Sequence, residues 1–427
     1  MSAFDRIIGY DDIKLELARF ASVLREPERY SKLGVTTPSG ILLSGEPGLG
    51  KTLMAKCFIT EAGCKAYTLR KDKPDGDFVN QIKETFEKAK NDTDGIAIVF
   101  LDDMDKFANE DNMHCDAEEY VAVQSCIDDC KGCGVFVFAT VNDRYCLPRS
   151  LMRAGRFDKV IEVEAPKGKE AEDIIRHFLE QKQIMGDIDI EEISRMMEGK
   201  SCAELETVIN EAGIYAGYAG KDKIDQEDVI KSCMRMIFDA LECMNPTDNG
   251  RIKNIAVHEA GHAVVSEILD PGSVTLVSVC GYSGSVEGLT KMHRLERRDV
   301  SKELQEHEVI GTLAGKAATE MVFGTADVGC NADMHKIFDA VMEFVDNNCT
   351  LGFETFEGIS SSQYLLEKKD RLVASEVERY YRIAKQIIVE NRDFLDRVVD
   401  ALLDHKTVTY RELQEIRKSC KTAISSR

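Results

Sequence analysis

The sequence contains no long hydrophobic run. Its longest apolar stretches, Ile96 to Leu101 and Val135 to Val141, are six and seven residues long, whereas a membrane-spanning helix needs about twenty. The first twenty residues mix charged with apolar side chains, so they lack the continuous apolar segment of a signal peptide. We therefore expect a cytoplasmic protein, or one at the cytoplasmic face of a membrane if an N-terminal anchor has been removed.

The sequence also lacks an excess of positive charge. It has 55 Lys and Arg against 76 Asp and Glu, a formal net charge of −21. Nucleic-acid binding depends on clustered Lys and Arg that neutralise phosphates, so we expect no nucleic-acid partner. With 427 residues, 43% hydrophobic and 31% charged, the chain has the composition of two or three globular domains.

Fourteen cysteines are scattered along the chain. In a large enzyme-like sequence this pattern favours free thiols over a disulfide framework. Cys126, Cys130 and Cys133 have a spacing that can ligate an iron–sulfur cluster. A helix end followed by a turn is the favoured interpretation, because thiols also serve as small buried hydrophobes.

A nucleotide-binding motif follows the first apolar strand. Ile41 to Ser44 is typical of a buried strand, GEPGLGKT follows at once, and Leu53 to Ile59 continues as a helix. In this arrangement backbone N–H groups bind phosphates, the lysine contacts the β and γ oxygens, and the threonine ligates Mg²⁺. The predicted ATP contacts are Gly45, Glu46, Pro47, Gly48, Leu49, Gly50, Lys51 and Thr52.

Further polar residues follow the later apolar strands. Asp102, at the end of strand 96–101, is placed to hold Mg²⁺, and Asp103 would orient or deprotonate the attacking water. Asn142 follows the strand 135–140, where it could contact a γ-phosphate. Arg153 and Arg156 have the spacing of two arginine fingers that act on the nucleotide of a neighbouring subunit.

An HExxH motif begins at His258. On a helix, His258 and His262 lie on one face and can bind one Zn²⁺, while Glu259 can act as a general base toward a water molecule. Catalytic zinc usually has three protein ligands. The candidates for the third are Glu320, Asp333 and His335; the last two lie about 200° apart on a helix, so both cannot face one metal.

Two further segments of the C-terminal half have recognisable patterns. Glu287 to Met292 could form an edge strand that pairs with an extended peptide, or an ordinary hairpin strand. A long helix is expected from about Val373 to His405, with Val377, Tyr381, Ala384 and Ile388 on one packed stripe.

Together these motifs resemble the FtsH-type AAA+ metalloproteases over nearly the whole chain. The resemblance implies an α/β P-loop AAA+ ATPase core (1–166) with a helical lid (167–240), a linker (241–250) and a mainly α-helical zincin-type peptidase domain (251–427). It implies an ATP-driven homo-hexamer that degrades unfolded or tagged proteins and uses Zn²⁺, ATP and Mg²⁺. The segments that carry it are FDRIIGYDDIK, GEPGLGKT, VFLDDMD, ATVN, LMRAGRFD, CAELETVINEAG, HEAGH, LAGKAATEMVFG and EVERYYRIAKQIIVENRDFLDRVVDALL.

The resemblance also assigns individual residues. It implies that Asn142 is the nucleotide sensor and that Arg153 and Arg156 are the fingers. It implies Asp333 as the third zinc ligand, and we interpret Glu320 as a carboxylate that orients a ligand.

Two departures from the family pattern affect the motor. Asp103 stands where the family has a glutamate, and its side chain is shorter by about 1.5 Å, which predicts slow ATP hydrolysis. In the loop where the family grips substrate, the nearest match is Phe78; alternatively, Phe78, Ile82 and Phe86 are the apolar face of a helix that continues to Lys90. These departures leave open a chaperone-like ring that binds ATP and proteins but cleaves little. A plain zinc endopeptidase is a second alternative.

Overall fold

The computed structural model describes most of the chain as two compact units, which are considered separately. The first comprises Met1–Ile190 and Met197–Val229, and the second comprises Glu191–Met196 and Ile230–Arg427. The described residues are 2–71, 77–92, 95–107, 117–153, 155–238, 249–279, 288–293, 301–325, 328–346, 348–349, 351–353 and 362–420.

The first unit is built on a five-stranded sheet in the order β2-β3-β4-β1-β5. Each neighbouring pair is parallel. The central strands are almost entirely buried apolar residues, as expected where helices cover both faces of a parallel sheet. The strands are β1 (Gly40–Ser44), β2 (Lys65–Leu69), β3 (Ala97–Leu101), β4 (Val135–Val141) and β5 (Lys159–Glu162).

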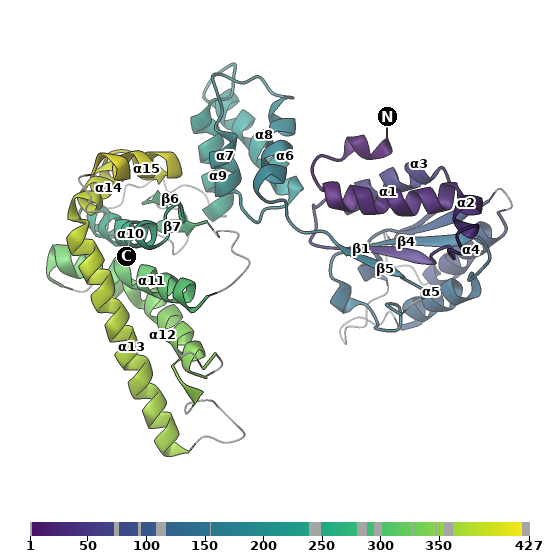
Figure 1. Ribbon diagram of the computed structural model, residues 1–427. Helices are drawn as coiled ribbons and strands as arrows, with labels where there is room; N and C mark the ends of the chain where they lie inside the picture. The colour runs from purple at the N-terminus through teal and green to yellow at the C-terminus, as the bar shows by residue number, and fades with distance from the viewer. Residues whose placement is uncertain are drawn as a thin grey trace. The chain divides into compact units, whose positions relative to one another are not determined.

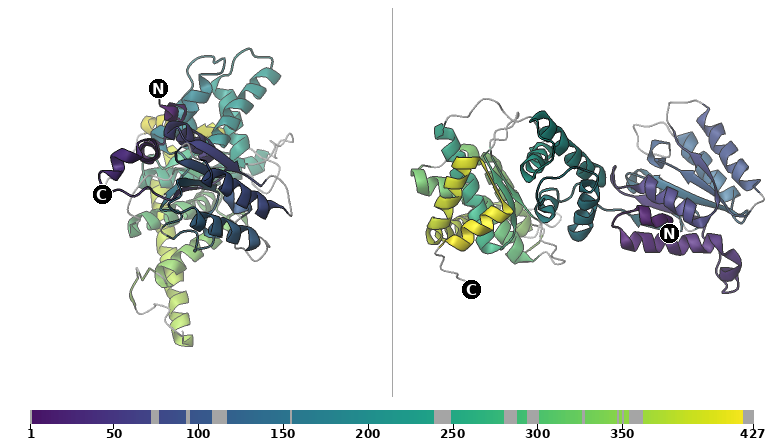
Figure 2. Two further views of the ribbon diagram at one scale, coloured as in Figure 1. Left: turned by 90° about the vertical axis from the view of Figure 1, so that its right-hand side faces the viewer. Right: turned by 90° about the horizontal axis from the view of Figure 1, so that it is seen from above.

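Helices flank this sheet on both faces (Figures 1 and 2). On one face α3 packs against α1 and β4, and on the other α4 packs against α5, β2 and β3. The sequence therefore folds as the predicted α/β core. The helices are α1 (Asp11–Arg25), α2 (Pro27–Ser31), α3 (Lys51–Ala62), α4 (Phe78–Lys90) and α5 (Ala117–Asp129).

Four helices follow the sheet, in the region predicted to be a helical lid. The longest of them, α8, begins with a capping box, in which Ser201 and Glu204 satisfy each other's backbone N–H groups. Contacts assign α6 and α8 to the first unit, together with the sheet. The helices are α6 (Gly168–Leu179), α7 (Ile190–Met196), α8 (Cys202–Tyr218) and α9 (Gln226–Phe238).

The second unit is mainly helical, as predicted for the peptidase half. Its centre is the packing of α10 against α11, and α13 runs alongside both α11 and α12 (Figures 1 and 2). A continuous core of buried apolar residues, aliphatic and aromatic, joins these helices. They are α10 (Asn249–Leu269), α11 (Lys302–Phe323), α12 (Asn331–Asp346), α13 (Gln363–Glu390), α14 (Arg392–His405) and α15 (Tyr410–Ser419).

A small antiparallel sheet packs against α10 in this unit. Its strands are ordered β7-β6-β8, so β7 is an edge strand within the described sheet. The strand predicted at Glu287 to Met292 is thus present from Leu289, and Glu287 itself lies outside the described residues. The strands are β6 (Val274–Ser278), β7 (Leu289–Met292) and β8 (Thr407–Thr409).

Two sequence-based boundaries differ from the structure. The long C-terminal helix is two helices, because the chain bends at Asn391 (φ −115°, ψ 33°), whose side-chain amide donates to the carbonyl of Ile387. The buried stripe contains Tyr380, with Tyr381 only partly buried. Most of the predicted linker 241–250 lies outside the described residues, and its last two residues begin α10.

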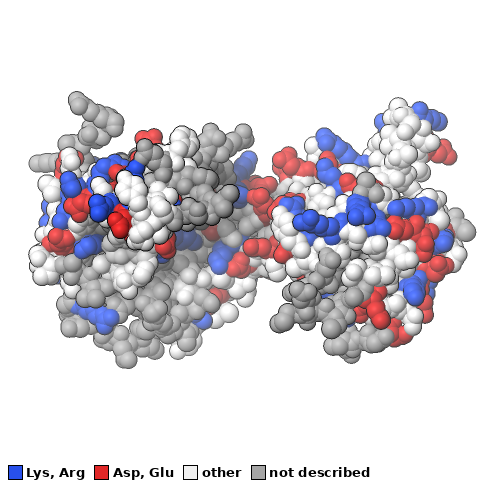
Figure 3. Space-filling model, turned by 90° about the horizontal axis from the view of Figure 1, so that it is seen from below, with Lys and Arg blue, Asp and Glu red and all other residues white. Residues whose placement is uncertain are grey.

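The described surface carries charges of both signs. Basic and acidic side chains lie next to one another on the face drawn in Figure 3. No helix among the described residues is long and apolar enough to cross a membrane. The cysteines that the structure describes carry free thiols.

Candidate ATPase and peptidase sites

The predicted phosphate loop, Gly45 to Thr52, joins β1 to α3. Its backbone enters the left-handed region at Gly48 (φ 82°) and Gly50 (φ 84°), which glycine adopts without strain. Since α3 begins at Lys51, the free N–H groups of its first turn are available to bind an anion. The local geometry therefore suits a phosphate group.

The amine of Lys51 lies close to Asn142, as expected if both contact a phosphate. Its Nζ donates to the carbonyl of Glu46 at 2.7 Å and to Oδ1 of Asn142 at 3.0 Å. Burial lowers the pKa of Lys51, and nearby carboxylates oppose this shift. The predicted sensor and the P-loop lysine thus share one site, although they are distant in sequence.

Asp102, at the end of β3, is buried and hydrogen-bonded to two threonines. Its Oδ1 accepts from Oγ1 of Thr52 and from Oγ1 of Thr140, both at 2.9 Å. Thr52 and Asp102 are the two residues predicted to hold Mg²⁺, and hydroxyl and carboxylate oxygens are suitable ligands for it. Thr140, which sequence reasoning did not identify, orients the carboxylate from the neighbouring strand β4.

Asp103 has a less favourable setting for a general base. Its backbone is left-handed (φ 54°), and its carboxylate forms ion pairs with Lys106 at 2.8 Å and Arg70 at 3.7 Å. The Asn142 side chain donates to Asp105, at 3.0 Å, rather than to Asp103. The short carboxylate is therefore held by cations at the edge of the site.

The two arginines predicted as fingers differ in their surroundings. Arg156 forms a bidentate pair with Asp128, at 3.0 and 2.6 Å, and donates to the carbonyl of Ser150. Hydrogen bonding to this guanidinium lowers the pKa of Asp128 to about 2. Arg153 is exposed and forms no side-chain hydrogen bond or ion pair with any part of the chain that the structure describes. The role of either residue in a neighbouring subunit stays a prediction.

The prediction that Phe78 grips substrate is wrong for this structure. Phe78 is only 2% exposed, begins α4 and packs edge-on against Phe107 with ring centroids 5.2 Å apart. Ile82 and Phe86 are buried on the same helix face. The alternative of an apolar helix face is thus confirmed, because a side chain in the core cannot contact a substrate.

In the second unit, three glycines allow α10 and α11 to approach closely. A Cβ atom at Gly261 would lie 2.6 Å from the carbonyl oxygen of Ala314, and one at Gly311 would lie 2.4 Å from Oγ of Ser266. A Cβ at Gly315 would lie 2.5 Å from Nε2 of His262. Any side chain at these positions would push the helices apart.

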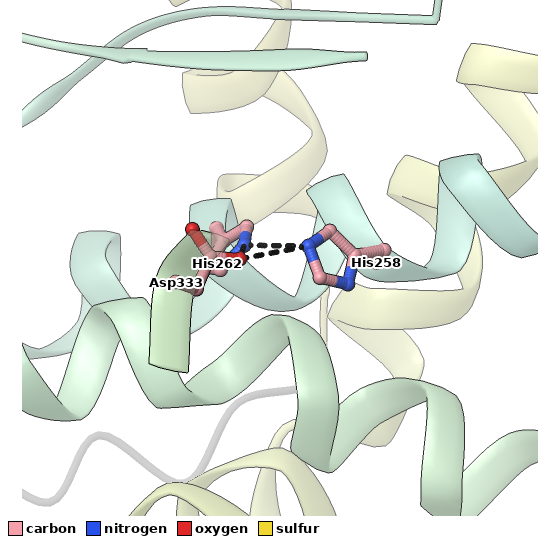
Figure 4. Close-up of side chains that lie close together, drawn as sticks. All are labelled: His258, His262 and Asp333. Atoms are coloured by element: carbon pink, nitrogen blue, oxygen red, sulfur yellow. Dashed lines mark hydrogen bonds and ion pairs between the residues drawn. The ribbon is translucent and has the colours of Figure 1, made fainter. Parts of the chain in front are cut away.

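This close packing places the HExxH histidines beside α12. Nε2 of His258 and Nε2 of His262 are 3.0 Å apart, and they lie 3.2 and 3.4 Å from Oδ2 of Asp333 (Figure 4). Nδ1 of His262 is 2.9 Å from the carbonyl of Gly311, so in the neutral imidazole Nδ1 carries the proton and Nε2 is free to bind a metal. Three donor atoms from two helices thus converge.

The donor set fits a zinc ion. At bond lengths of about 2.0 to 2.1 Å, the ligand atoms of a tetrahedral zinc are about 3.3 Å apart, close to the observed separations of 3.0 to 3.4 Å. Two imidazoles and one carboxylate are also the ligand types of catalytic zinc sites, which keep a fourth position open. No other group with metal-binding geometry occurs among the described residues.

The pKa values of Asp333 and His262 are shifted by their mutual contacts. Burial alone would raise the pKa of Asp333, but hydrogen bonds from His258 and His262 lower it below its usual range. Burial opposes protonation of His262, yet its bond to Asp333 raises the pKa of this histidine. Asp333 is therefore ionised at neutral pH, as a metal ligand must be.

Glu259, the predicted general base, lies next to this cluster on α10. Its side chain is largely buried, at 8% exposure. Oγ1 of Thr290, on β7, donates to Oε2 of Glu259 at 2.7 Å. The carboxylate thus has a fixed partner outside its own helix.

The sequence matches three known families, one after another along the chain. Residues 41–165 match the ATPase family associated with various cellular activities (AAA), and residues 187–231 match the AAA+ lid domain. Residues 246–416 match peptidase family M41. The phosphate loop lies in the first match, and the His258, His262 and Asp333 cluster lies in the third.

Similarity to known proteins extends over almost the whole chain. An ATP-dependent zinc metalloprotease FtsH of Parabacteroides distasonis is 28% identical over 441 residues, covering 97% of this chain and 64% of its own length. The chain is similar to FtsH-type AAA+ metalloproteases over almost its whole length. FtsH-type relatives from Arabidopsis thaliana (FTSH 6, chloroplastic) and Caldicellulosiruptor bescii are 29% and 28% identical over 97% of this chain, and it spans 64% and 71% of their lengths.

Two of the three candidates for the third zinc ligand do not contact the histidines. Glu320 accepts hydrogen bonds from Tyr381 and from Lys385, the latter at 3.0 Å, both on α13. His335 is exposed on α12. Our interpretation of Glu320 as a carboxylate that orients a ligand is therefore wrong, because it is directed to another helix.

The sequence-based predictions missed several residues of these two sites. Thr140 and Thr290 each belong to a strand beside the predicted carboxylate, so finding them requires the strand pairing and not only the local pattern. Gly311 and Gly315 did give a signal, since glycines four residues apart on a helix indicate a close approach of another backbone.

Proposed function

We propose that the chain is an ATP-dependent zinc metalloendopeptidase that unfolds and degrades proteins. The observation that carries the proposal is the convergence of His258, His262 and Asp333 beside Glu259, on a chain that also has a P-loop site with its Thr52–Asp102 pair. The P-loop site supplies mechanical work, and the second site supplies peptide-bond hydrolysis. This combination also agrees with the names of the relatives, ATP-dependent zinc metalloproteases.

In the peptidase site, zinc bound by the three ligands would polarise the scissile carbonyl and acidify water. Glu259 takes a proton from the attacking water and transfers it to the leaving amine. An extended substrate pairs with the outer edge of β7, which lacks a neighbouring strand within the described sheet.

In the motor, Lys51 contacts the β- and γ-phosphates, and Thr52 with Asp102 holds Mg²⁺. Asp103 activates the attacking water, while Arg153 and Arg156 act on the nucleotide of the next subunit. The proposed assembly is a homo-hexameric ring that acts on unfolded or tagged proteins at a cytoplasmic site.

A degradation assay tests the proposal. The zinc-loaded protein should degrade an unfolded model protein rapidly only with ATP, and a zinc chelator or Glu259→Gln should abolish cleavage. ATP hydrolysis with no peptide products would support the chaperone-like alternative. Equal cleavage of loose peptides with and without ATP, with folded substrates left intact, would support a plain endopeptidase whose ATPase domain is only a scaffold.

A further inference from the structure

The side chain of Glu259 lies directly against the segment that enters β7. A Cβ atom at Gly288 would be 2.8 Å from Oε1 and 2.8 Å from Cγ of Glu259. No residue with a side chain can occupy this position without displacing the carboxylate. The edge strand and the predicted general base are therefore in van der Waals contact.

Thr290 lies two residues further along, and so on the same face of the strand. Its Oγ1 is 2.7 Å from Oε2 of Glu259 and 3.0 Å from the main-chain oxygen of the same residue. The hydroxyl has one proton, and it donates to the nearer carboxylate oxygen. A hydrogen bond to a charged acceptor is stronger than one between neutral groups. Gly288 and Thr290 thus hold the Glu259 side chain from one side.

The position of β7 does not depend on Glu259. Antiparallel pairing with β6 sets its register, with Thr290 opposite Val277. On the other face of the strand, Lys291 donates to the carbonyl of Met196. The Thr290 hydroxyl is therefore presented to α10 from a strand that is fixed by its own contacts.

We propose that Thr290 is a positioning residue for Glu259, an inference that rests on the proposed peptidase function. A glutamate side chain has three rotatable bonds, and a general base must lie within hydrogen-bond reach of the proton that it takes. The Thr290 hydroxyl holds Oε2 and leaves Oε1 to accept a proton from the attacking water. Because Thr290 is on the edge strand, peptide pairing and the orientation of the base depend on the same strand.

Substitutions of Thr290 in the full chain test this role. Thr290→Val keeps the shape of the side chain but removes the donor, and Thr290→Ser keeps the donor. With a short fluorogenic peptide, kcat of Thr290→Val should fall about 10- to 100-fold, the loss expected when a catalytic group moves by about 1 Å. KM should change less than about twofold and zinc content should not change, because neither the peptide-binding edge nor a ligand is altered.

Two variants serve as controls in the same assay. Thr290→Ser should retain activity to within about threefold, because its hydroxyl can still donate. Thr312→Val removes a hydroxyl that, among the described residues, bonds only within α11, to the carbonyl of Glu308 at 2.8 Å. This variant should match the parent. A kcat of Thr290→Val equal to that of the parent would overturn the proposal, as would an equal loss in Thr290→Ser.

Crystal structures of the parent and of Thr290→Val give a readout that does not depend on activity. The Glu259 carboxylate should occupy one position in the parent and leave that position in the variant. An unchanged Glu259 in Thr290→Val would overturn the positioning role even if the parent proves inactive. A zinc-loaded parent that cleaves no peptide would instead refute the proposed function, so the two failures are distinguishable.

Discussion

Gly315 is the residue whose substitution tests the zinc geometry most sharply. In Gly315→Ala, the added Cβ would lie 2.5 Å from Nε2 of His262 and 2.7 Å from Cε1 of His258. Unstrained contacts between such atoms are about 3.5 Å or longer, so the overlap is about 1 Å. Either the imidazoles must rotate or α11 must move away from α10.

Both responses damage the metal site. Rotation of the imidazoles separates the two Nε2 atoms from Asp333, and movement of α11 lengthens the 2.9 Å bond between His262 and the Gly311 carbonyl. Loss of such a supporting contact costs about 10- to 100-fold in metal affinity. Overpacking costs about 1 to 3 kcal/mol of stability, which exceeds the helix-propensity gain of about 1 kcal/mol for Gly to Ala.

The assay is a zinc titration against a competing chelator, together with thermal unfolding of the zinc-loaded protein. Gly217→Ala is a matched control, because Gly217 is also inside a helix and, beyond the backbone of that helix and its chain neighbours, no described atom lies within 4 Å of its added Cβ. The control should bind zinc as the parent does and should be no less stable. If Gly315→Ala binds zinc with the parent's affinity, the deduced contact between α11 and the histidines is refuted.

Three further predictions concern individual side chains. Asp103→Glu should raise ATP hydrolysis by about 10-fold or more, because a longer carboxylate reaches the attacking water; an unchanged rate would refute the account of slow hydrolysis. Arg153→Ala should lower ATP hydrolysis without changing the melting temperature, whereas Arg156→Ala should lower both, because it also breaks an ion pair; similar melting temperatures would contradict this difference. Asp333→Ala should remove zinc far more severely than Glu320→Ala, as measured by metal content after dialysis, and the reverse order would exchange their roles.

The sequence predicts the fold and the main sites well where the pattern is local. Buried strands, the phosphate loop and the HExxH helix are each specified by residues close together in the chain, and the structure contains all three. Asp102 lies beside Thr52 of the P-loop, as expected of a residue that follows an apolar strand there, and its role toward Mg²⁺ stays a prediction. Asp333 depended on the family resemblance, since helical geometry alone left other ligands open.

Predictions that depend on tertiary contacts were less successful. Phe78 has both the composition of a gripping loop and the spacing of an apolar helix face, and its packing against Phe107 decides between them. Glu320 lies five residues after Gly315 on α11, yet its bonds to α13 depend on the arrangement of the helices and not on the local sequence. No proline or glycine stands at Asn391, where the helix breaks, so the sequence pattern predicts one continuous helix.

The central claim is that this chain degrades proteins with the energy of ATP and cleaves their peptide bonds with Glu259 as the general base. The most direct test measures ATP turnover and peptide release together, for the parent and for Glu259→Gln, with a folded protein that carries an unstructured tag. The account predicts that Glu259→Gln hydrolyses ATP at the parent's rate, retains zinc and releases no peptides. Peptide release from Glu259→Gln at the parent's rate would contradict it.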